Sequence, residues 1–204
     1  FEVTQEPRWL RAAITLQEGQ EALFGDSAGG YYMTGSDGER LLVREKPWYD
    51  GALPSGNGVS VKNLMRFYTL TGEARWRKRA TQTLSVFGEQ LRKSPTSAPW
   101  MLKGLDHVLD RPKEVVLVGT GDNVGMSAML SVLRRKYVPN RAIVVMREGS
   151  DLESLVPFAE GKVAKGGSVT AYVCEARVCK RPTTDPNEFG QQLSEVVAYG
   201  STLH

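Results

Sequence analysis

The sequence predicts an α+β fold, with helices in residues 1–110 and a small α/β segment in residues 111–204. Two observations support this prediction. Through most of residues 7–109, apolar side chains recur every three or four positions, as they do along one face of an amphipathic helix. From residue 111 on, short apolar runs alternate with helical patterns, which is typical of βαβ units with a parallel sheet.

The first part is expected to hold four helices and one β-hairpin. Residues 31–34 and 40–44 are β-prone and flank the turn sequence Gly35-Ser-Asp-Gly38, so they predict a hairpin. Gly72 follows an apolar periodic stretch and predicts the end of a helix. The predicted helices cover residues 7–24, 59–70, 73–92 and 98–109.

The second part is expected to form a three-stranded parallel sheet. Its strands are predicted at residues 114–118, 141–146 and 169–174, where apolar residues follow one another as in a strand covered on both faces. Capping signals place helices between and after them: Ser150 with Glu153, and Asp185 with Pro186 at the first helical position. The predicted helices cover residues 122–137, 150–158 and 185–198.

Composition excludes several classes of protein. The chain has 204 residues and a net charge of +3, with acids and bases interspersed, so we expect no nucleic-acid partner. The basic run 75–79 lies within a helical pattern and is interpreted as a solvated helix face. No apolar run approaches the roughly 20 residues of a membrane helix, so we expect no membrane partner and a cytoplasmic location.

The loop of residues 46–58 is the main candidate site, because loops held by rigid elements often carry functional groups. Asp50 is the candidate acid, base or orienting group, close to the start of a helix whose free N–H groups favour polar ligands. Alternatively, Asp50 and the Pro-Ser-Gly-Asn-Gly sequence serve only turn and capping roles. The predicted substrate-binding residues are Lys46, Trp48, Tyr49, Ser55 and Asn57, with the two aromatic rings stacking on a sugar.

Catalysis at this loop requires groups that the loop does not supply. Glycoside hydrolysis ordinarily uses two carboxylates, and Asp50 is the one expected to face the site. Sugar epimerisation needs an acid/base pair, often histidines, but the chain has only His107, interpreted as a surface or capping residue, and the terminal His204. Any catalytic partner of Asp50 must therefore come from elsewhere, or the chain is not catalytic; no metal or cofactor is expected.

Cys174 and Cys179 are candidate redox residues. Four residues separate them, which is not the two-residue spacing of a thiol redox motif, and no further metal ligands lie at a recognisable spacing. A strand-end cysteine facing a loop cysteine can form a disulfide, and the neighbouring Arg177 and Lys180 can make a thiol more reactive. The favoured interpretation is nevertheless a pair of reduced thiols, with Cys174 buried on its strand.

A glycine-rich turn at residues 118–125 follows a predicted strand and opens a predicted helix. This is the context of a dinucleotide fingerprint, but the third glycine is one position late and the second strand lacks the required acid. We interpret the segment as an ordinary βα turn, with Asp122 capping the helix.

Two blocks of sequence carry a resemblance to a known family. Asp50-Gly-Ala-Leu-Pro-Ser-Gly-Asn57 is the first, and the second runs from Thr170-Ala-Tyr-Val-Cys174 through Cys179 to Pro182-Thr-Thr-Asp-Pro186. Together they resemble the C-terminal part of the thioredoxin-domain-containing, YyaL-like family, which includes spermatogenesis-associated protein 20.

The resemblance implies an architecture and a function. The full protein would carry a thioredoxin-like domain, then a six-hairpin, glycosidase-like α/α toroid, then a small α/β segment. This chain would hold a partial toroid, which docks on the thioredoxin-like and toroid portions of its parent. The resemblance also implies a carbohydrate-active protein, glycosidase-like or sugar-epimerase-like, with a sugar or polyol ligand. The alternative is a non-catalytic binding module or a redox-accessory module.

Overall fold

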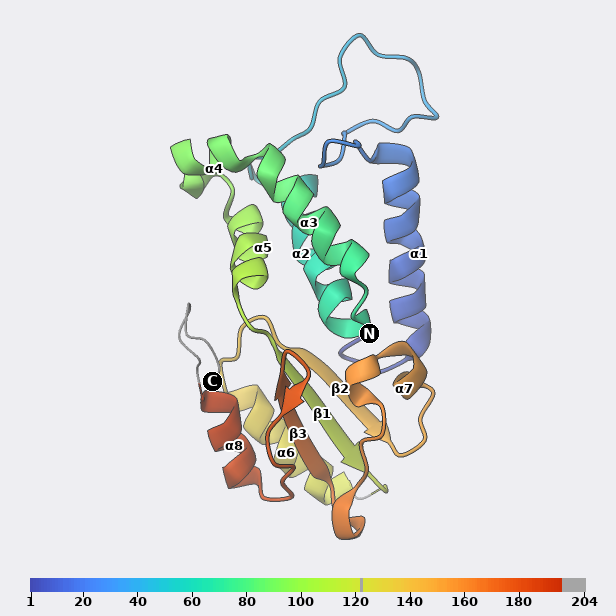
Figure 1. Cartoon of the computed structure of the whole chain (residues 1–204), viewed down its shortest axis with the longest axis vertical. Coiled ribbons are helices and arrows are strands. Elements are labelled where there is room, and N and C mark those ends of the chain that lie inside the picture. Colours follow the sequence, from blue (N-terminus) through green and yellow to red (C-terminus); the bar gives the residue numbers. More distant parts are fainter. Residues whose placement is uncertain (122, 196–204) are drawn as a thin grey trace. The chain divides into compact units, whose positions relative to one another are not determined.

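The computed structural model describes residues 1–121 and 123–195 of a mixed α+β protein. The chain forms two compact units. The helical unit comprises Arg8–Tyr68 and Gly72–Leu109, and the sheet unit comprises Phe1–Pro7, Thr69–Thr71 and the described residues from Asp110 on. Figure 1 shows the elements of each unit. None of the described helices is both long and apolar enough to cross a membrane.

The helical unit follows the predicted periodicity, with one break. Its helices are α1 (Pro7–Phe24), α2 (Gly56–Thr71), α3 (Ala74–Val86), α4 (Gly88–Lys93) and α5 (Pro99–Leu109). The single helix predicted over residues 73–92 is wrong, because Phe87 leaves the helical conformation (φ −101°, ψ 9°) while its side chain is buried. Gly88 follows it, and a glycine lowers the cost of such a break.

The predicted β-hairpin at residues 31–44 is also wrong. The described residues there form no strand ladder, only an isolated bridge between Gly25 and Tyr31. A two-stranded ribbon is marginal in water unless it packs a face against a core. Here the second predicted strand has no such face, because Leu41, Leu42 and Val43 are all exposed.

The sheet unit contains a mixed four-stranded sheet in the order β2-β1-β3-β4. Its strands are β1 (Lys113–Gly119), β2 (Ala142–Arg147), β3 (Thr170–Glu175) and β4 (Val178–Cys179). β1 and β2 are parallel, as predicted, but β3 is antiparallel to β1, with Val116 opposite Tyr172. The prediction of three parallel strands is therefore wrong.

The connection between β2 and β3 explains this direction. A parallel pair needs a crossover that returns the chain to the other end of the sheet, usually through a helix. The connection holds only short elements: α7 (Leu152–Leu155), η2 (Pro157–Ala159) and η3 (Lys165–Gly167). β3 therefore begins at the end of the sheet where β2 stops, since Thr170 pairs with Val118 and Met146 also pairs with Val118.

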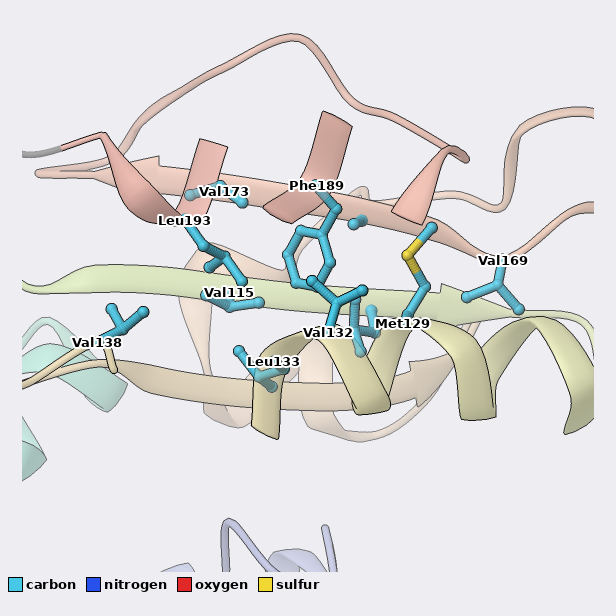
Figure 2. Packing of buried hydrophobic residues seen from close by; sticks show 11 residues of the cluster. Val115, Met129, Val132, Leu133, Val138, Val169, Val173, Phe189 and Leu193 are labelled. Atoms are coloured by element: carbon cyan, nitrogen blue, oxygen red, sulfur yellow. The ribbon is translucent and has the colours of Figure 1, made fainter. Parts of the chain in front are cut away.

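Two helices, α6 (Asn123–Arg135) and α8 (Pro186–Ser194), contribute to a buried cluster on one face of the sheet. Val115 and Leu117 of β1 belong to this cluster. Phe189 of α8 lies among the side chains of α6 and the sheet (Figure 2). Asp185 caps α8 as predicted, accepting a hydrogen bond from the Asn187 backbone N–H at 2.8 Å. The prediction that this helix continues past Ser194 toward Ala198 is wrong, because Glu195 has extended backbone angles (φ −67°, ψ 125°). Asp122, residues 196–198 and His204 lie outside the described residues.

The N-terminal segment of the sheet unit binds the edge of β2. The Glu2 carboxylate accepts a hydrogen bond from the Ile143 N–H at 3.1 Å, and the Gln5 side-chain oxygen accepts one from the Val145 N–H at 2.9 Å. Unpaired edge strands attract other chains, and covering their backbone groups prevents this. These contacts therefore protect the β2 edge.

Candidate functional site

Asp50 braces the 46–58 loop against α5. One carboxylate oxygen accepts a hydrogen bond from the Ser55 N–H at 2.7 Å, and the other accepts one from the Trp100 N–H at 2.7 Å. Both oxygens thus bind backbone groups, one of them fifty residues away in the sequence. This geometry supports a structural role, and the catalytic role of Asp50 stays a prediction.

Asn57 and Ser55 also bind backbone groups. The Asn57 amide donates to the carbonyls of Tyr31 (2.9 Å) and Pro47 (2.8 Å), and its oxygen accepts from the Tyr31 N–H at 2.7 Å. Ser55 is the N-cap of α2 and accepts from the Gly58 N–H at 3.1 Å. Both residues are buried, so they anchor the loop instead of facing solvent.

Lys46 holds the loop from its other end. Its ammonium forms an ion pair with Asp26 and donates to the Gly29 carbonyl at 3.1 Å. The hydrogen bond from Lys46, followed by those from Tyr32 and the Ala28 N–H, keeps the pKa of Asp26 well below its usual range. Lys46 is thus occupied by a structural partner.

Two aromatic residues of the loop remain accessible. The rings of Trp48 and Tyr49 meet edge to face with their centroids 6.3 Å apart. Tyr49 is exposed and Trp48 is half-buried. Of the six loop residues predicted from the sequence, these two are the ones that still offer a surface for stacking.

His107 lies inside the helical unit, so its interpretation as a surface or capping residue is wrong. It is buried on α5, with its Nδ1 atom 3.2 Å from the Lys62 ammonium. Burial, followed by the charges of Lys62 and Arg66, lowers the pKa of His107 to about 3. An imidazole in this environment is neutral at physiological pH.

A groove lies between α1 and α3 in the helical unit. Its volume is about 490 Å³. Two carboxylates line it, each paired with an arginine: Glu18 with Arg75 at 2.9 Å, and Glu21 with Arg79 at 2.8 Å. Trp76, Lys78 and Gln82 complete much of the lining. The basic run 75–79 is therefore only partly solvated, since Trp76 is buried and Arg79 half-buried.

In the sheet unit, a disulfide bond joins Cys174 and Cys179. The favoured interpretation of two reduced thiols is therefore wrong for this structure. Cys174 on β3 stands directly opposite Cys179 on β4, so the bond links two paired strands. Cys174 is 1% exposed, whereas Cys179 is open to solvent.

The hairpin that carries the disulfide turns through two residues in the left-handed region. Ala176 has φ 48° and Arg177 has φ 67°, the pattern of a type I′ turn. That turn ordinarily contains Asn or Gly, because side chains with a Cβ resist positive φ. The sequence Glu175-Ala-Arg-Val178 therefore gave no sign of the hairpin.

Glu114 of β1 holds this turn in place. Its buried carboxylate accepts from the Arg177 N–H at 3.3 Å and pairs with the Arg177 Nε at 3.3 Å. Burial raises the pKa of Glu114, although the charges of Arg177 and Lys162 oppose that shift. This contact joins residues that are sixty-three positions apart in the sequence, and it supports a turn whose own residues disfavour that conformation.

The glycine-rich segment that follows β1 behaves as a packing turn in its described residues. A Cβ on Gly119 would lie 3.2 Å from Met126 of α6, so this glycine permits close approach of helix and strand. The Thr120 hydroxyl donates to the Gly167 carbonyl at 3.1 Å. These contacts favour the ordinary βα turn. Within residues 1–121 and 123–195, no cluster of metal-binding side chains is found.

Comparison with known proteins finds relatives that cover nearly the whole chain. It is 34% identical to spermatogenesis-associated protein 20 of Homo sapiens over 198 residues, which is 95% of the chain. It is 33% identical to the Rattus norvegicus protein of the same name over 200 residues. This chain is a relative of spermatogenesis-associated protein 20. The resemblance predicted from the two sequence blocks is confirmed.

The relatives of this chain are much longer than the chain itself. It spans about 25% of each spermatogenesis-associated protein 20 it matches, which is consistent with a C-terminal part of that family. An uncharacterized protein of Caenorhabditis elegans is 28% identical over 187 residues. No family model matches the chain, and no solved structure matches it.

Proposed function

We propose that this chain is a non-catalytic, redox-responsive part of a larger relative of spermatogenesis-associated protein 20. The observation that supports the proposal is the Cys174–Cys179 disulfide, which has one buried and one exposed sulfur on a short edge hairpin. Thiol–disulfide exchange requires access to a sulfur atom, and this hairpin supplies it. Reduction and re-formation of the bond would report the redox state of the surroundings.

The expected cytoplasmic location belongs to the same proposal. Cytoplasmic disulfides of mesophiles are usually transient, and they serve catalysis or redox sensing more often than stability. The loop that this bond closes is also short, with a sequence separation of 5. A loop of that size restricts the unfolded chain modestly, by about 2 kcal/mol in the chain-entropy model, so the reduced protein should stay folded.

An equilibrium redox titration tests the proposal. The chain is incubated in glutathione buffers of defined potential, alkylated, and analysed by mass spectrometry, while circular dichroism monitors the fold. We expect reversible reduction of the pair without unfolding, at a potential above about −300 mV, the region typical of labile disulfides. A potential below that value, or irreversible unfolding on reduction, would identify a structural disulfide and reject the proposal.

Binding of a sugar or polyol is a second candidate, favoured by the groove between α1 and α3. Carboxylates and guanidinium groups face each other there beside the Trp76 ring, and such groups can bind hydroxyls as acceptors and donors. For the whole parent, the corresponding proposal is a carbohydrate-active toroid. A thioredoxin-like domain would precede it and exchange electrons with the hairpin.

Calorimetric titration with mono- and disaccharides tests this second candidate. We expect measurable binding that Glu21→Gln weakens, because Glu21 lines the groove. Glu89→Gln is the matched control, since Glu89 is an exposed carboxylate on α4. Equal binding by the two variants, or no binding by the unmodified chain, would reject a polyol site in this groove.

A further inference from the structure

The two sulfur atoms of the disulfide differ in how accessible they are to an incoming thiolate. Cys174 lies within β3 and is 1% exposed, between the buried Val173 and the half-buried Glu175. Cys179 lies on the two-residue strand β4, whose residues are both exposed. Thiol–disulfide exchange requires collinear attack on one sulfur, so access decides which sulfur reacts.

A cation stands beside the accessible sulfur. The Lys162 ammonium lies 3.4 Å from the Cys179 sulfur and 5.1 Å from the centre of the Tyr172 ring. Tyr172 also fixes the backbone next to Lys162, because its hydroxyl donates to the Val163 carbonyl at 2.7 Å and accepts from the Val163 N–H at 3.2 Å. The lysine is therefore held near the sulfur by a buried residue of β3.

Other charges near the hairpin already have partners. Arg177 pairs with Glu114, and Lys180 pairs with Glu195. Lys113 pairs with Glu175, the residue opposite it in the β1–β3 register and next to the hairpin turn. By contrast, the Lys162 ammonium lies against the Cys179 sulfur and the Tyr172 ring, and its charge also acts on the Glu114 carboxylate.

From this geometry we infer that Cys179 is the sulfur attacked by a dithiol reductant, and that Lys162 is a positioning residue that stabilises the Cys179 thiolate. The inference rests on the redox role proposed above. A positive charge near a sulfur attracts the incoming thiolate and favours the departing one. Complete reduction also requires a second thiol to resolve the mixed disulfide, so the exchange partner is a molecule or protein with two neighbouring thiols.

The exchange proceeds in two balanced steps. A thiolate of the reductant attacks the Cys179 sulfur, a mixed disulfide forms, the Cys174–Cys179 bond breaks, and Cys174 leaves as a thiolate that takes up a proton. The second thiol of the reductant, as its thiolate, then attacks the reductant's first sulfur, which is bonded to Cys179 in the mixed disulfide. Cys179 leaves as a thiolate beside Lys162, and the reductant becomes a disulfide after giving up two electrons.

The site of attack is tested by trapping with glutathione, which has one thiol and can stop at the mixed disulfide. The oxidised chain is mixed with glutathione, quenched with acid within seconds, and mapped by peptide mass spectrometry. We expect glutathione on Cys179 in at least tenfold excess over Cys174. Equal labelling, or labelling mainly on Cys174, would overturn the assignment of Cys179.

The role of Lys162 is tested by the rate of reduction with dithiothreitol. Lys162→Met keeps the aliphatic stem and should slow reduction about fivefold at low salt, the effect of one unit charge at roughly 4 Å in water. Lys162→Arg should restore much of the rate. Lys165→Met is the matched control, because Lys165 is an exposed lysine of the same segment and should react normally.

A second measurement separates this role from simple packing. In the reduced chain, the pH midpoint for alkylation of Cys179 should move to higher pH in Lys162→Met and stay in place in Lys165→Met. Unchanged rate and midpoint in Lys162→Met would overturn the inference about Lys162. In that case reversible reduction above about −300 mV would still support the proposed function, whereas a disulfide that resists reduction would reject both.

Discussion

Individual polar side chains of the 46–58 loop bind backbone groups, and these hydrogen bonds hold the side chains in place. Asp50 and Asn57 together accept or donate five hydrogen bonds to backbone atoms. A buried donor or acceptor that loses its partner costs about 1–3 kcal/mol, so such residues are as constrained as catalytic ones. Their density in a loop is therefore a sign of bracing as well as of binding.

The bracing role of Asp50 can be measured directly. Asp50→Ala should lower the free energy of unfolding by about 1–3 kcal/mol, because the N–H groups of Ser55 and Trp100 both lose their acceptor. Urea denaturation followed by circular dichroism checks this value. Glu39→Ala, at an exposed acid in the preceding segment, is the control with little expected change. A stable Asp50→Ala variant would return Asp50 to the list of ligand-binding candidates.

His107 should make stability depend on pH. Its pKa is about 3 in the folded chain and about 6.5 when unfolded, so the unfolded state binds the extra proton first as pH falls. Its contribution is fully present above pH 6.5 and is lost as pH falls toward 3, with a slope of at most about 1.4 kcal/mol per pH unit. Denaturant titrations from pH 7 to 4.5 measure the slope.

The comparison variant for this pH dependence is His107→Gln, which carries no titrating ring. It should show a flatter profile between pH 6.5 and 4.5, a range in which most carboxylates are still ionised. If both proteins lose stability equally over that range, His107 does not control the effect.

Among the elements, the β3–β4 hairpin combines an unfavourable turn with two supports. Ala176 and Arg177 both have positive φ, which costs non-glycine residues roughly 1–2 kcal/mol each. The Glu114 carboxylate and the disulfide hold the turn from its two sides. The same two supports set the position of the exposed sulfur, so the element serves the proposed redox function through its geometry.

Relief of this turn strain should stabilise the chain. Ala176→Gly should raise the free energy of unfolding by about 1 kcal/mol, since glycine adopts positive φ without a steric penalty. Thermal denaturation of the oxidised chain measures the gain. The matched control is Ala22→Gly on α1, an exposed helical alanine whose replacement should cost about 1 kcal/mol. A loss of stability in Ala176→Gly would show that the turn is not strained.

At the scale of the whole molecule, stability is divided between two compact units with separate buried residues. In the sheet unit, side chains from α6, α8 and the sheet form one cluster around Phe189 (Figure 2). Because each unit has its own core, a substitution in one core should destabilise mainly that unit.

Phe189→Ala tests this division. Removing a fully buried phenylalanine should cost about 3–5 kcal/mol. Hydrogen exchange should rise in the amides of β1 and β3, while those of α2 and α3 keep their protection. Leu16→Ala, at an exposed leucine of α1, should change neither. Equal loss of protection in all four elements would mean that the chain unfolds as one cooperative unit.

The sequence was informative where structure depends on neighbouring residues. Apolar periodicity placed α1 and α5 closely, and the capping residue Asp185 placed the start of α8, since these signals act within a few positions. The resemblance to spermatogenesis-associated protein 20 was also evident from two short blocks. The candidate redox site was only partly evident from the sequence. Cys174 and Cys179 stood out, but no local pattern pointed to Lys162.

What the sequence by itself determined was therefore the location of most of the helices and of the three main strands, and the resemblance to spermatogenesis-associated protein 20. The tertiary structure alone decided the direction of β3, the pairing of the two cysteines, and the use of Asp50 and Asn57 as backbone braces. Each of these depends on groups far apart in the chain, such as Asp50 with Trp100 and Glu114 with Arg177. Such contacts form only when the whole fold brings their partners within hydrogen-bond distance, and no local pattern encodes them.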